Sequence, residues 1–140
     1  MKTIAREDES DTRAAGSSTT VWVGRIASAL PILFLLVDGA MKLIKPAPVV
    51  GATVQLGYAE SVIVGLGVTL LVCTILYAIP QTTVLGAILL TGYLGGATAT
   101  HVRVGGPMFA ILFPGMLAVL IWGGLWFRDE RVRALIPLRR

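Results

Sequence analysis

A few ionisable residues interrupt an otherwise apolar sequence, and they are the first candidates for chemistry. Asp38 and Lys42 are four residues apart, so on a helix they share a face and can form an ion pair. His101 and Asp38 are groups that could relay protons to or from a bound molecule. An ionisable group inside an apolar segment is costly, which makes each one a candidate for function. The complete candidate set is Asp38, Lys42, Glu60, Tyr93, His101 and Arg103.

Each candidate also has a purely structural interpretation. Asp38 and Lys42 could simply neutralise each other near a helix end. Glu60 and Arg103 could be solvated at the lipid headgroups, and a lone histidine is more often an interfacial residue than a catalyst. The functional interpretation gains support because four successive membrane helices would bring Asp38, Lys42, Glu60, His101 and Arg103 to one membrane face, with Asp38 the deepest of the five. Tyr93 shares a helix stripe with His101 and could extend this polar cluster toward the midplane.

No cofactor can be identified from the sequence. One histidine, no paired cysteines and no Glu-x-x-His pattern argue against the common metal sites. There is no glycine-rich phosphate loop and no serine nucleophile motif, and a single histidine gives haem a ligand on one side only. Cys73 is the one cysteine, so neither an internal disulfide nor a CxxC redox pair can form.

The composition indicates which elements must position the candidate residues. Hydrophobic residues make up 55% of the 140 residues and charged residues 14%, whereas soluble domains carry about 25% charged residues. The lipid bilayer is therefore the expected environment. Arginines cluster near the C-terminus, where they suit anionic lipid headgroups better than nucleic acid, because no soluble fold remains to present them.

Four apolar segments match the roughly 20 residues that a helix needs to cross a bilayer. The fold predicted from them is an all-α transmembrane four-helix bundle with antiparallel up-and-down connections. Short connections at 80–82 and 102–106 make neighbours of consecutive helices. The predicted spans are about 21–44, 61–79, 83–101 and 107–127.

Three further segments flank or connect the spans. Residues 1–20 are polar and lack a periodic apolar pattern, which predicts a disordered tail. Residues 45–60 are longer than the other connections and fairly apolar, so we expect a short helix or re-entrant piece on the mouth of the bundle, with a plain loop as the alternative. Residues 128–140 form a basic tail.

The distribution of basic residues predicts the orientation. Nine lysines and arginines fall on the side of the termini and three on the other side, which favours cytoplasmic termini. Four aromatic residues are expected in a belt at that cytoplasmic interface: Trp22, Tyr77, Trp122 and Trp126.

Stripes of small residues predict where the helices approach each other. Gly92, Gly96 and Thr100 form one stripe on the third span, and Gly95 with Ala99 forms another. On the second span, Gly65, Thr69 and Cys73 repeat at four-residue spacing. We expect all of these at helix–helix contacts.

The sequence resembles the DoxX-like family of small four-helix membrane proteins. The resemblance rests on three stretches: GRIASALPILFLLVDGAMKLIKPAPVV, QLGYAESVIVGLG and YAIPQTTVLGAILLTGYLGGATATHVRVG. It implies a four-helix bundle in a bacterial inner membrane. Relatives in the wider family are linked to membrane redox chemistry, including a quinone-reducing thiosulfate oxidoreductase subunit and an oxidative-stress complex. Many related chains carry an acidic residue in the second span, where this chain reads GLGVTLLVC.

Three functions are compatible with these features. The first is a binding or accessory subunit that holds a small lipophilic molecule, such as a quinone, and supports a partner protein. The second is an oxidoreductase subunit acting directly on quinone, with electrons exchanged with an outside donor. The third is a small transporter or channel, for which a homo-oligomer would have to supply the pathway.

Overall fold

The computed structural model describes residues 2–135, with side chains from residue 18 to residue 134. All the regular elements in this part of the chain are helices, which confirms the all-α prediction. In chain order they are α1 (Lys2–Ile44), α2 (Ala47–Gln55), the 3₁₀ helix η1 (Glu60–Val62), α3 (Ile63–Ala78), α4 (Thr83–Arg103), α5 (Met108–Arg128) and α6 (Glu130–Leu135).

Four helical stretches are long and apolar enough to cross a membrane. They are Ser18–Ile44, Glu60–Ala78, Thr83–Arg103 and Met108–Arg128. Each agrees to within a few residues with a predicted span, because a long run of apolar residues is a strong signal for such a helix.

The first helix begins earlier than expected. A disordered tail was predicted over residues 1–20, but α1 starts at Lys2 and runs without interruption into the first span. A formed helix extends at little cost, since each added residue gains a backbone hydrogen bond. At the other end of the chain, the predicted basic tail contains α6, and its last residues, 136–140, lie outside the described part.

Each of the four long helices packs against two of the others, so together they form a ring. α1 packs against α3 and α5, and α4 packs against the same two helices, so α1 and α4 face each other across the interior. The buried core includes Leu35, Leu70, Leu90 and Ile121. Apolar side chains on the outside remain exposed, for example Val119 at 72% and Leu33 at 65%, which suits contact with lipid tails.

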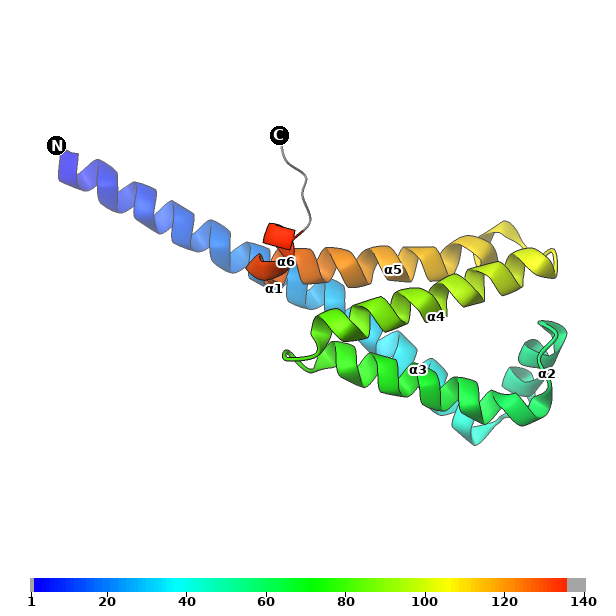
Figure 1. The fold of residues 1–140 in the computed structure, drawn as a ribbon. Helices are drawn as coiled ribbons and strands as arrows, with labels where there is room; N and C mark the ends of the chain where they lie inside the picture. The colour runs from blue at the N-terminus through cyan, green and yellow to red at the C-terminus, as the bar shows by residue number, and fades with distance from the viewer. Residues whose placement is uncertain (1, 136–140) are drawn as a thin grey trace.

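The two ends of the ring differ in width. Figure 1 shows α3 and α4 close together at their connecting turn, residues 79–82, and well separated at the other end, where α2 lies. We refer to these as the turn end and the α2 end. α2 has nine residues and is therefore too short to cross a bilayer, and it confirms the short helix expected in the 45–60 connection.

Glycines at helix contacts are not the ones that the small-residue stripes predicted. A Cβ on Gly86 would collide with the backbone of Tyr77, so α3 and α4 touch there. By contrast, a Cβ on Gly92, Gly95 or Gly96 would have no heavy atom within 4 Å. The same is true of Gly65 on α3, and Thr69 is exposed. The predicted contacts at these glycines and at Thr69 are therefore wrong, whereas Cys73 is buried in the core as expected. Gly92 and Gly96 lie where α4 has diverged from α3, and Gly95 is about 180° around the helix from Gly86.

Tyr77 also lies elsewhere than predicted. It is fully buried at the turn end instead of facing the lipid interface. Its hydroxyl donates to the Ile121 carbonyl at 2.8 Å and lies 3.0 Å from the Ser28 Oγ. This side chain therefore ties α3 to α5 and α1, and it occupies the interior that would otherwise be empty at this end.

Candidate functional site

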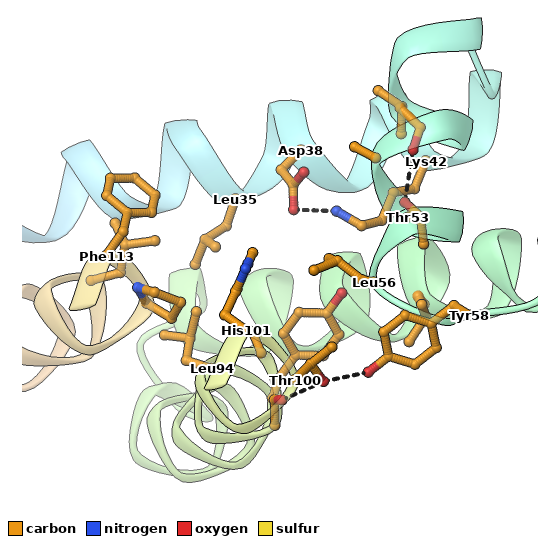
Figure 2. A pocket seen from close by; sticks show the side chains of 18 of the residues that line it. Leu35, Asp38, Lys42, Thr53, Leu56, Tyr58, Leu94, Thr100, His101 and Phe113 are labelled. Carbon is orange, nitrogen blue, oxygen red and sulfur yellow. Dashed lines mark hydrogen bonds and ion pairs between the residues drawn. The ribbon is translucent and has the colours of Figure 1, made fainter. Parts of the chain in front are cut away.

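A cavity of about 520 Å³ occupies the interior of the ring toward the α2 end. Its walls come from α1, α2, α4 and α5, and α3 contributes Leu66 alone. The cavity exists because α3 and α4 separate, and α2 lies over its mouth (Figure 2). Small residues on α4, among them Gly92, Gly96 and Ala97, keep the space open.

Four of the six residues singled out in the sequence line this cavity. Asp38 and Lys42 come from α1, and Tyr93 and His101 come from α4, the helix across the ring. Figure 2 shows the His101 ring directed from α4 toward the α1 side of the cavity, where Asp38 and Lys42 lie. The expected convergence of these four residues is thus present in the structure.

Asp38 and Lys42 form the predicted ion pair. The Lys42 Nζ donates to the Asp38 Oδ2 at 2.5 Å. The Lys42 side chain is 14% exposed and the Asp38 side chain 36%, so the pair is partly buried and can still meet a molecule in the cavity. Gly67 on α3 makes room for this arrangement, since a Cβ there would lie 2.8 Å from the Lys42 Cβ.

A second polar group at the mouth was missed in the sequence. The Tyr58 hydroxyl lies 2.9 Å from the Thr100 Oγ1. Because Thr100 donates its own hydrogen to the Gly96 carbonyl at 2.8 Å, Tyr58 is the donor in this pair. This bond joins the segment after α2 to α4. Thr53 of α2 also lines the cavity, but its hydroxyl donates to the Val49 carbonyl of its own helix.

The rest of the cavity is apolar. Leu35, Leu94 and Leu117 form its deeper wall. Phe34 and Phe113 close the side between α1 and α5, with ring centroids 5.1 Å apart in an edge-to-face contact. The cavity thus combines one polar side with an extended hydrophobic surface, as a molecule with a polar head and an apolar body would require.

Glu60 and Arg103, the other two predicted site residues, do not line the cavity. The Glu60 carboxylate accepts from the Lys45 Nζ at 2.8 Å, and the pair is exposed. Arg103 donates to the Leu56 carbonyl at 2.8 Å. On a helix, two residues place Arg103 about 200° around from His101, so the two side chains cannot share a face.

Both residues instead hold the α2 segment in place. Lys45, which precedes α2, has φ 56°, and Gly57, which follows it, has φ 85°. The left-handed backbone conformation of these two residues lets the chain change direction at each end of the helix. The Lys45–Glu60 ion pair stabilises the chain reversal before α2, and the Arg103–Leu56 hydrogen bond stabilises the reversal after it. Together they hold α2 over the cavity.

Among the residues whose side chains are described, no three His, Cys, Asp or Glu groups come together in an arrangement that could hold a metal ion. The chemistry available in the cavity is hydrogen bonding, charge and proton exchange.

Comparison with known proteins agrees with the fold. The model of the DoxX-like family matches residues 26–124. A search of curated proteins and a search of solved structures each returned no match. The matched region contains the greater part of all four apolar helices, which indicates a multi-pass membrane protein. Since the match covers most of the chain, the protein belongs to the DoxX-like family.

Proposed function

We propose that the protein binds a small lipophilic molecule in the cavity and serves as a binding or accessory subunit in the membrane. The observation that carries this proposal is the cavity itself, which joins an ion pair and a histidine to a leucine- and phenylalanine-lined interior. Its volume of about 520 Å³ lies within the range of about 300–1,000 Å³ that is usual for small-molecule sites.

A quinone is the ligand class that fits both parts of the cavity. Its ring carbonyls accept hydrogen bonds, which the Lys42 ammonium, the Tyr93 hydroxyl and the His101 ring can donate. Its ring and side chain are apolar and match the remaining walls. The redox chemistry linked to relatives in the wider family supports the same choice.

A second function is an oxidoreductase subunit that acts on quinone. The observation in its favour is that Asp38 and His101, two groups able to accept protons, line the same cavity. A hydroquinone releases two protons and two electrons on oxidation, and the electrons would pass to a partner protein. His101→Gln should then abolish turnover by the assembled complex while quinone binding persists. Under the binding function, the same variant changes affinity alone.

Native mass spectrometry in mild detergent tests the binding proposal. The wild-type protein should retain a small molecule, and Ala97→Phe should lose it, because Ala97 lines the cavity and a phenyl ring would fill that space. Ala99→Phe is the matched control, since Ala99 is exposed and does not line the cavity. Equal retention by all three proteins would contradict a ligand in this cavity. The same spectra would report a protein partner or a homo-oligomer.

We further infer a bacterial inner-membrane location, with an up-and-down antiparallel bundle and both termini in the cytoplasm. The excess of basic residues on the side of the termini supports this orientation. Reporter fusions at residues 104 and 140 test it. Phosphatase activity is expected from a fusion at residue 104 and not from one at residue 140, and the reverse pattern would contradict the orientation.

A further inference from the structure

The separation of α3 and α4 leaves one side of the cavity without a wall. At the turn end the two helices touch, as the close contact between Gly86 and Tyr77 shows. Further along α4, Gly92 and Gly96 line the cavity but are exposed, with no heavy atom within 4 Å of either Cβ position. Leu66 is the single α3 residue at the cavity. The boundary between α3 and α4 is therefore open beside these glycines.

Toward the α2 end, hydrogen bonds mark the limit of this opening. The Tyr58–Thr100 hydrogen bond connects the segment after α2 to α4, one helical turn beyond Gly96. Arg103 adds a second connection through the Leu56 carbonyl. Between Gly92 and Thr100 the opening is about 12 Å long, given the rise of an α-helix. It lies within a helix that is long and apolar enough to cross a membrane, so we expect it to face the hydrocarbon region of the bilayer.

We propose that the bound molecule carries a hydrocarbon tail, which passes out of the cavity between α3 and α4, beside Gly92 and Gly96, into the bilayer. This inference rests on the proposed binding function and specifies its ligand as an amphiphile drawn from the membrane. The polar head lies near Asp38, Lys42 and His101, where charge and hydrogen-bonding groups are gathered. The tail stays in an apolar environment along its whole length, so no part of it has to enter water.

The same opening gives the molecule its way in. The Lys45–Glu60 pair, the Arg103–Leu56 bond and the Tyr58–Thr100 bond hold the α2 segment at the mouth, so moving this segment aside to admit a molecule from the aqueous side would break them. Entry from the bilayer requires none of these to break. Glycine at positions 92 and 96 leaves room for the passage of a chain, which any larger residue would narrow.

Two probes that share a head group distinguish the contribution of the tail to binding from the contribution of the head. One is a substituted benzoquinone with a ten-carbon chain, and the other is the same benzoquinone without the chain. Binding is measured by titration calorimetry on the full-length protein in detergent. Gly96→Leu should weaken binding of the chain-bearing probe by about tenfold, an effect typical of steric exclusion in an apolar site. Binding of the chainless probe should fall much less, because its head lies near Asp38, Lys42 and His101 and it has no tail to pass Gly96.

Gly95→Leu is the matched control, because Gly95 is also exposed, has equal room for a Cβ and does not line the cavity. It should affect neither probe, and Gly92→Leu should repeat the result of Gly96→Leu. Melting temperatures close to that of the wild type would show that all three variants fold. If Gly96→Leu affects both probes equally or neither, the tail passage is wrong and the cavity site stands. If the wild-type protein binds neither probe, the binding function fails and the passage fails with it.

Discussion

At the turn end of the bundle, the helices are pressed together and the interior is filled. Gly86 lies against the backbone of Tyr77, and the Tyr77 hydroxyl is bonded to α5 and α1. At the α2 end, a Cβ on Gly92 or Gly96 of α4 would have no heavy atom within 4 Å, and the interior holds a cavity bordered by the Asp38–Lys42 pair. Both ends contain glycine, tyrosine and hydroxyl residues. The comparison shows that the angle between α3 and α4, more than residue type, separates the structural end from the candidate site.

Gly86→Leu should produce the largest change in stability. The backbone of Tyr77 occupies the space that a side chain needs, so the helices must shift apart, at a cost of about 3 kcal/mol or more. Gly92→Leu, on the same helix but in the open region, should cost less than about 1 kcal/mol. Thermal unfolding in one detergent measures both. Equal losses of stability in the two variants would contradict the difference in packing between the turn end and the α2 end.

Loss of Lys42 should have the next largest effect. Lys42→Met leaves the Asp38 carboxylate partly buried without its partner, and we expect a cost of about 2 kcal/mol, below the range for fully buried pairs because Asp38 is 36% exposed. The double variant Asp38→Asn with Lys42→Met should be more stable than Lys42→Met alone, since no charge is left unpaired. If the two substitutions simply add, Asp38 and Lys42 do not interact.

The smallest effect should come from removing one hydroxyl at each end. Tyr77→Phe leaves the buried Ile121 carbonyl without this donor and should cost about 1–2 kcal/mol. Tyr58→Phe removes a partly buried bond to Thr100 and should cost less than about 1 kcal/mol. Chemical denaturation of the two variants measures the difference. A greater loss for Tyr58→Phe would mean that α2 contributes more to stability than the packed turn end does.

Features that depend on local spacing could be predicted from the sequence. The four spans follow from long apolar runs, and the Asp38–Lys42 pair follows from the four-residue repeat of a helix. Their position near His101 follows from the order of the spans, which returns successive helix ends to the same face of the membrane.

Features that depend on the directions of neighbouring helices could not be predicted. Gly86 and Gly96 are both small residues on α4, and their opposite surroundings arise from the divergence of α3, which no local pattern encodes. Arg103 and His101 are expected together because both end the third span at the same membrane face, but the helix turns their side chains to different sides. Tyr58 lies in an irregular segment whose path over the cavity is set by tertiary contacts.

Photolabelling with an azido-benzoquinone that carries a ten-carbon chain tests most directly whether the cavity is a binding site. Peptide mass spectrometry of the labelled protein in lipid nanodiscs locates the attached probe. We expect labels concentrated on residues that line the cavity, such as Lys42, Thr53 and Tyr93, and loss of these labels when unlabelled quinone competes. Labels spread over lipid-facing residues such as Leu33 and Val119, unaffected by competitor, would contradict the account.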